Sequence, residues 1–258
     1  MLKEDVINRI ISKFPDKTII YAGCRVKKIN FDYCYNDLVI FPSEISPSIF
    51  DEENKVIIYG LQNEKSLFKE DTIPLYDPYF KYNLAVSENK SALIKNITKN
   101  SLKESIKHLS EISFFGSISF YASVARLIEP AVVLSGTSLS PSHIFSQINK
   151  ENSEILKKIF EILQIDSNLG SILKQRAYTL ASLMQKNSSI IFLKKIDNLL
   201  NNKKDVEASV YFFHELSKLG GNKLQMLSKD FKFGAVEDRK KNEALDLVKT
   251  LSQKLNDF

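Results

Sequence analysis

The residues best suited to chemistry lie in a basic turn between two apolar runs, within residues 21–41. They are Gly23, Cys24, Arg25, Lys27 and Asp37. A glycine lets the backbone approach another group closely, and a carboxylate is an oxygen ligand for a divalent cation. Guanidinium and ammonium groups bind phosphate through charge-assisted hydrogen bonds. The turn therefore predicts a phosphate-binding site, and a solvent-facing loop is the simpler alternative.

With its flanking runs, this segment resembles the nucleotidyltransferase superfamily, over about the first 97 residues. That family pairs a strand ending in Gly-Ser with a following strand of the form Asp-x-Asp-Leu-hydrophobic. Gly23-Cys24 takes the Gly-Ser place, and Tyr35-Asn36-Asp37-Leu38-Val39 takes the place of the acidic strand. The resemblance implies an α/β fold, a nucleotide ligand and bound magnesium or manganese.

In that family, the two acids of the second strand point from one face and jointly hold the metal ions that bridge nucleotide phosphates. Here Tyr35 replaces the first acid, and only Asp37 remains. The resemblance implies that Asp77, after a later apolar run, is the further catalytic acid and metal ligand. The implied metal site, Asp37 with Asp77, is degenerate, and nucleotidyl transfer is expected to be reduced or lost. In the simpler interpretation, Asp37 only ends a turn.

Other catalytic classes lack their signatures in the sequence. There is no glycine-rich phosphate loop, and no close pair of cysteines or histidines has zinc-ligand spacing. The three histidines, His108, His143 and His214, are far apart, and ordinary surface or core roles are expected for them. Cys24 and Cys34 can approach each other across adjacent strands, where they either form a disulfide or, in a reducing compartment, stay thiols.

A second combination of aromatic and charged residues lies near the C-terminus. Phe231-Lys232-Phe233-Gly234 precedes the charged stretch Glu237-Asp238-Arg239-Lys240-Lys241. Such a surface can bind single-stranded nucleic acid or a protein partner. In the simpler interpretation, the two phenylalanines anchor a loop to the helices, Gly234 turns the chain and the charges begin a helix.

Periodicity predicts the elements that position these residues. Val6, Ile10 and Phe14 recur at helical spacing and Pro15 follows them, so a first helix is expected to end near Phe14. Short β-branched or aromatic runs predict four strands of a mixed sheet, at 18–21, 38–41, 56–59 and 73–76. Pro74 cannot donate a ladder hydrogen bond, which places the last strand at an edge or makes it irregular.

From about Thr98 the apolar period changes to the 3.6 residues of a helix. Helices are expected near 100–112, 117–128, 142–164, 170–185, 189–200, 204–219 and 236–256. The segments Leu134 to His143 and Gly220-Gly221 are expected to be connections. The sequence thus predicts an α/β domain with a mixed sheet over residues 1–97, followed by an all-α helical bundle over residues 98–258.

Composition and charge limit the possible functions. Hydrophobic residues make up 43% and charged residues 26%, as in a globular protein. The first 97 residues carry 13 Lys/Arg and 14 Asp/Glu, and the remainder carries 23 and 17, so a net charge of +6 lies in the helical part. The most apolar window, Phe114 to Leu134, contains Arg126 and Glu129, which excludes a membrane span and indicates a buried helix. Two cysteines and a charged N-terminus favour the cytoplasm.

The features above predict a nucleotide- or polyanion-binding protein that resembles a nucleotidyltransferase with a degenerate metal site. An active metal-dependent nucleotidyltransferase using Mg²⁺ or Mn²⁺ would need the complete acid set. The alternative is a non-catalytic protein-interaction or scaffold module that acts through the helical domain. A third interpretation is nucleic-acid binding by the basic helices, for which affinity falls steeply with salt. No membrane partner is expected.

Overall fold

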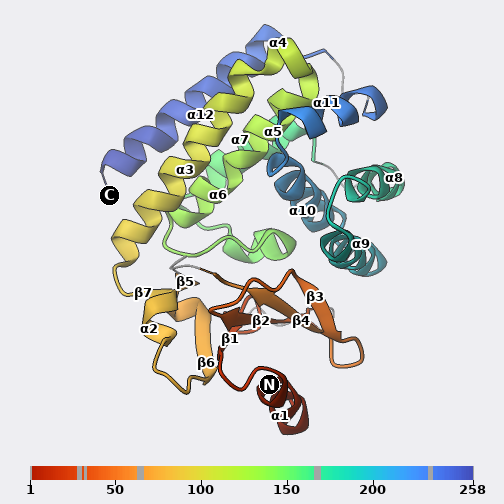
Figure 1. The fold of residues 1–258 in the computed structure, drawn as a ribbon. Coiled ribbons are helices and arrows are strands. Elements are labelled where there is room, and N and C mark those ends of the chain that lie inside the picture. Colours follow the sequence, from red (N-terminus) through yellow and green to blue (C-terminus); the bar gives the residue numbers. More distant parts are fainter. Residues whose placement is uncertain are drawn as a thin grey trace. The chain divides into compact units, whose positions relative to one another are not determined.

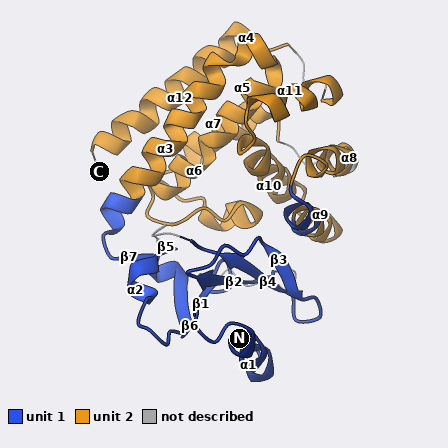
Figure 2. Cartoon of the chain, viewed as in Figure 1, with its two compact units in different colours: residues 1–93, 185–191 blue, residues 94–184, 192–258 orange. Residues whose placement is uncertain are grey.

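The computed structural model describes residues 2–27, 31, 34–62, 67–165, 170–231 and 235–257. The chain forms two compact units (Figures 1 and 2). The first unit comprises residues 1–93 and 185–191, and the second comprises residues 94–184 and 192–258. The sequence predicts a division after residue 97. In the structure the division lies after Leu93, inside the helix α3 (Lys90–Ser110).

The first unit is built on a five-stranded mixed sheet in the order β3-β4-β2-β1-β6. Its strands are β1 (Thr18–Ala22), β2 (Asn36–Phe41), β3 (Ser48–Asp51), β4 (Val56–Gly60) and β6 (Thr72–Tyr76). Strand β1 pairs antiparallel with both β2 and β6, β2 pairs parallel with β4, and β3 pairs antiparallel with β4. The predicted mixed sheet is confirmed, and the strand that contains Pro74 lies at its edge, as expected.

Alternation along the strands divides the side chains between the two faces of the sheet. One face carries the larger apolar cluster, with Ile19, Leu38, Ile40 and Ile58, and the helix α1 (Glu4–Lys13) packs on it (Figure 1). The apolar stripe of α1 contributes Val6 and Ile10, both almost fully buried. The opposite face carries Ile20, Val39, Phe41, Leu61 and Ala85.

Small elements complete the first unit after β4. They are β5 (Leu67–Phe68), the 3₁₀ turn η1 (Lys69–Asp71), α2 (Tyr82–Ala85) and β7 (Val86–Ser87). β5 and β7 form a separate two-stranded parallel pair. The sequence did not predict β3, β5 or β7, because each has four residues or fewer and shows no alternation long enough to recognise.

The second unit is helical, as predicted. Its elements are α3 (Lys90–Ser110), α4 (Ile112–Phe115), α5 (Ser117–Arg126), α6 (Ile128–Val133), η2 (Pro141–Gln147), α7 (Ser153–Leu163), α8 (Gly170–Ala181), α9 (Lys186–Asn201), α10 (Asp205–Ser217), α11 (Gly221–Asp230) and α12 (Asp238–Asn256). The first residues of α3 and α9 belong to the first unit. The helix α5 is central to the core, since every residue from Ile118 to Ala125 is buried. None of the helices in the described ranges has both the length and the apolar character needed to cross a membrane.

Several helix boundaries differ from the prediction. The helix expected near 100–112 is α3, which already begins at Lys90. The helix expected over 142–164 is two elements, η2 and α7, because Asn149 and Asn152 stabilise a turn between them. The Asn149 side chain accepts the backbone N–H of Glu151 and Asn152, and the Asn152 amide donates to the Gln147 carbonyl. Such side-chain hydrogen bonds compete with the helical ladder. Gly221, expected in a connection, begins the helix α11.

Candidate functional site

The turn after β1 brings Gly23 against Asp37, as the sequence analysis requires of a joint site. Ala22 and Asp37 form the last register pair of β1 and β2, so Gly23 follows directly at the open end of this strand pair. Gly23 has φ +85°, and a Cβ atom there would lie 2.5 Å from Asp37 Oδ2. Only glycine satisfies both the backbone conformation and this close approach.

The carboxylate of Asp37 also has a phenol partner on the neighbouring strand. The Tyr59 hydroxyl, on β4, donates to Asp37 Oδ1 at 3.1 Å. This partner was missed by sequence reasoning, because β2 and β4 are separated by β3 in the chain and their parallel pairing leaves no local pattern. Its only sequence signal is the aromatic residue at the end of the apolar run 56–59.

Tyr21 lies next to this site and keeps its proton. Its hydroxyl donates to Asn36 Oδ1 at 2.6 Å, and the Asn36 amide donates to the Asn54 carbonyl at 2.8 Å. Burial raises the pKa of Tyr21 to about 12; the nearby charge of Arg25 opposes the rise and that of Asp37 adds to it. Tyr21 therefore acts as a neutral hydrogen-bond donor that fixes the start of β2.

The two predicted phosphate-binding cations have structural partners in the first unit. Arg25 Nη2 donates to the Cys34 carbonyl at 2.7 Å, which ties the turn to the approach of β2. Lys27 Nζ lies 3.5 Å from Asp71 Oδ2, and the two side chains are only 7% and 16% exposed. Burial lowers the pKa of Lys27, and the charge of Asp71 opposes this shift. Both cations are thus partly buried, and each has a polar partner within the first unit.

Asp77 lies at the opposite end of β1. Its carboxylate accepts the Thr18 hydroxyl at 2.7 Å and the backbone N–H groups of Lys81 and Tyr82 at 2.8 and 2.9 Å. Asp37 pairs with Ala22, the last residue of β1. Asp77 directly follows Tyr76, which pairs with Ile19 near the start of β1. At about 3.3 Å per residue, the two positions are about 13 Å apart along the strand. The structure therefore does not bring the predicted acid pair together, and Asp77 instead holds the chain that enters α2.

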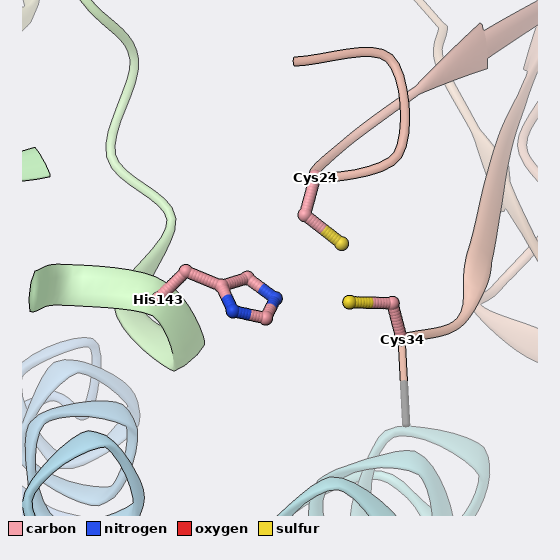
Figure 3. Close-up of side chains that lie close together, drawn as sticks. All are labelled: Cys24, Cys34 and His143. Carbon is pink, nitrogen blue, oxygen red and sulfur yellow. The ribbon is translucent and has the colours of Figure 1, made fainter. Parts of the chain in front are cut away.

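The two cysteines do meet, as the sequence analysis anticipated for adjacent strands. Their Sγ atoms lie within 4.8 Å of each other, and the side chains point toward one another (Figure 3). Both are thiols and both are buried, with 9% of Cys24 and 3% of Cys34 exposed. The backbone N–H of Phe31 donates to Cys34 Sγ at 3.4 Å. Cys24, in the turn that carries Gly23 and Arg25, therefore lies beside Cys34, which precedes β2.

The histidines belong to the second unit, including His143, which Figure 3 also draws. His143 is buried within η2. His108 Nε2 lies 3.3 Å from the Ser217 carbonyl, and its Nδ1 lies 3.5 Å from Glu111 Oε2. Burial lowers the pKa of His108; burial and the charges of Lys218 and Arg126 lower that of His214. At neutral pH these two rings are uncharged core groups of the helical unit.

The C-terminal combination of aromatic and charged residues has packing and helix-surface roles where the structure describes it. Phe231 is buried against Phe212, with ring centroids 6.0 Å apart, as expected of a loop anchor. Lys232, Phe233 and Gly234 lie outside the described residues. In α12, Arg239 pairs with Glu243 and Lys241 pairs with Asp238, so these charges form ion pairs along their own helix.

The fold and the site define a chain in which a mixed-sheet unit is followed by a helical unit, with a glycine turn, the Asp37 carboxylate and two thiols at one end of the sheet. Comparisons with family models, with curated proteins and with solved structures find no match to this chain.

Proposed function

We propose that the first unit binds the phosphate groups of a nucleotide at the open end of β1 and β2, in the manner of a nucleotidyltransferase with a degenerate metal site. The observation that carries this proposal is the contact between Gly23 and the Asp37 carboxylate. Because Gly23 has no Cβ, the backbone of the turn lies directly beside this carboxylate, which is an oxygen ligand for Mg²⁺ or Mn²⁺ and would hold such an ion next to the turn.

The positions of the two predicted acids, Asp37 and Asp77, support binding without transfer. Tyr35 stands where a paired carboxylate would be, and Asp77 lies at the far end of β1. Metal-dependent nucleotidyl transfer relies on carboxylates that hold the metal ions against the phosphates. With Asp37 as the carboxylate beside Gly23, the proposed role is a nucleotide-binding module.

Arg25 is the proposed phosphate ligand. The Cys34 carbonyl fixes its guanidinium, so less conformational entropy is lost when it meets an anion. Lys27 contributes less in this proposal, because its side chain is nearly buried and pairs with Asp71. In this proposal the anion binds at the turn after β1 and not on the basic surface of the helices.

The test is equilibrium binding of ATP to the full chain, with and without MgCl₂, together with an assay for nucleotidyl transfer. Arg25→Ala should weaken ATP binding about 10-fold, the value of one charge-assisted hydrogen bond. Asp37→Asn should leave metal-free binding unchanged or improve it, because it removes a negative charge near the phosphates. The matched control is Lys17→Ala, which removes one positive charge from the opposite end of β1.

Two results would count against this proposal. If Arg25→Ala and Lys17→Ala have the same ATP affinity as the wild type, the turn is not the phosphate site. If Asp37→Asn abolishes a measurable transfer activity, the site is an active metal centre and not a degenerate one.

A second candidate function is protein binding through the helical unit. Several large apolar side chains on this unit are well exposed, among them Phe114 by 77%, Met226 by 58% and Phe145 by 53%. Exposed apolar side chains of this size are typical of interaction surfaces when they are contiguous. Absence of ATP binding by the wild type, combined with loss of a stoichiometric protein partner in Phe114→Ser, would favour this function over the first.

A further inference from the structure

The pairing of β1 with β2 brings the two thiols to the same end of the sheet. The register of these strands ends at Ala22 and Asp37, and Cys24 and Cys34 lie two and three residues beyond that pair. The two sulfur atoms come within 4.8 Å of each other at this open end (Figure 3). In tetrahedral zinc, two thiolate ligands at about 2.3 Å from the metal are about 3.8 Å apart. The pair would have to close by no more than about 1 Å to hold one ion.

Three features around the pair are compatible with metal-bound sulfur. The backbone N–H of Phe31 donates to Cys34 Sγ at 3.4 Å, and outer hydrogen bonds of this kind orient and support ligands in metal sites. The Arg25 guanidinium donates to the Cys34 carbonyl and places a positive charge near the pair, which would interact favourably with the negative charge of a metal-bound thiolate. Both cysteines are at least nine-tenths buried, which limits the access of water and oxidants.

We propose that Cys24 and Cys34 bind Zn²⁺ and supply two of its four ligands. Each thiol loses its proton on binding, so one Zn²⁺ and two thiols give one zinc dithiolate and two protons. The ion would fasten the turn that carries Gly23 and Arg25 to the start of β2. This proposal does not depend on nucleotide binding. It also differs from the magnesium or manganese expected at Asp37, because thiolates select soft cations and carboxylates select hard ones.

The experiment uses the full chain, reduced and stripped of metal with a chelator. Zn²⁺ is titrated against a chromophoric competitor, and Co²⁺ is titrated as a spectroscopic probe. We expect one Zn²⁺ per chain, two protons released per ion, and a sulfur-to-cobalt charge-transfer band. Cys24→Ser and Cys34→Ser should each lower the Zn²⁺ affinity about 100-fold, the share of one thiolate in a zinc site. The matched control is Asp5→Asn, which removes an exposed carboxylate of α1 and should leave the Zn²⁺ affinity unaltered.

A second measurement covers the case in which the serine variants do not fold. In the wild type, saturating Zn²⁺ should slow the reaction of both thiols with an aromatic disulfide reagent at least about 10-fold. The proposal is overturned if the double serine variant binds Zn²⁺ as tightly as the wild type. It is also overturned if the thiols react at the same rate with and without Zn²⁺, or if oxidised glutathione forms the Cys24–Cys34 disulfide as fast in the presence of Zn²⁺ as in its absence.

Discussion

Gly23 shows how one residue combines backbone conformation with a tertiary contact. Its φ of +85° requires glycine, and the Asp37 carboxylate occupies the space that a Cβ would need. The approach of these two residues follows from the predicted strand-turn-strand pattern. The position of Asp77 could not be predicted from that pattern, because it depends on the pairing of β6 with β1 and on the direction of that pairing. Tyr59 escaped prediction for the same reason.

Gly23→Ala should lower the free energy of unfolding by about 2–3 kcal/mol, because it combines a strained φ with a steric clash. Gly116→Ala is the control for strain alone, since Gly116 has φ +71° and nothing within 4 Å of the added carbon. Gly220→Ala is the control without either effect. Urea denaturation gives the free energy of unfolding of each variant, and the loss should be largest for Gly23→Ala, smaller for Gly116→Ala and smallest for Gly220→Ala. Equal losses for Gly23→Ala and Gly116→Ala would show that the Asp37 contact costs nothing.

Tyr21 should make the stability of the protein fall at high pH. Its pKa in the folded chain is about 12, against 10.0 for an ordinary tyrosine. Between these two values the unfolded chain loses the proton first, so the free energy of unfolding decreases as the pH rises through this window. Tyr21→Phe should flatten this part of the pH profile, although it also removes the hydrogen bond to Asn36 at all pH values. If the free energy of unfolding falls equally steeply for the wild type and Tyr21→Phe between pH 10 and 12, the raised pKa of Tyr21 is contradicted.

At the scale of elements, the first helix, the four longer strands and most of the helical unit could be predicted, because each has an apolar period long enough to count. The short strands and the break between η2 and α7 could not. The break depends on hydrogen bonds from Asn149 and Asn152 to backbone groups, and the same asparagines are compatible with a helix surface in sequence. The apolar period of 142–164 continues through the break, so it conceals the turn.

Asn152→Ala should destabilise the helical unit by about 1–3 kcal/mol. The Asn152 side chain is nearly fully buried; its amide donates to the Gln147 carbonyl and its oxygen accepts the N–H of Asn149. Truncation leaves those buried backbone groups without their partner. Asn222→Ala, at an exposed position of α11, is the matched control and should change stability by less than about 0.5 kcal/mol. Chemical denaturation followed by circular dichroism compares the two. A loss for Asn152→Ala no larger than that for Asn222→Ala would show that the turn does not need the side chain.

At the scale of the whole molecule, the division into two units was predicted from the change of period near Thr98. The structure places it after Leu93 and assigns residues 185–191 to the first unit. A single helix, α3, contains the division, so no change of secondary structure marks it in the sequence. The inclusion of the start of α9 has no sequence signal either, since a periodic helix does not reveal which unit it packs against.

The second unit should fold as a fragment, because it has its own buried core. A fragment of residues 94–258 should be helical and should unfold cooperatively. A fragment of residues 98–258 lacks Ile94, which is 1% exposed, and should be less stable by about 1–3 kcal/mol. Circular dichroism with thermal unfolding tests both. If neither fragment folds, the two units depend on a common core.

The edge position of β6 also affects how the protein behaves at high concentration. An open strand edge offers unpaired N–H and C=O groups on which a strand from another molecule can add. Pro74 has no N–H, and it occupies the middle of β6, next to Ile73, which is 47% exposed. An apolar edge without this proline would be a template for intermolecular β-pairing. We therefore expect Pro74 to limit such pairing, an effect that is separate from any ligand the chain binds.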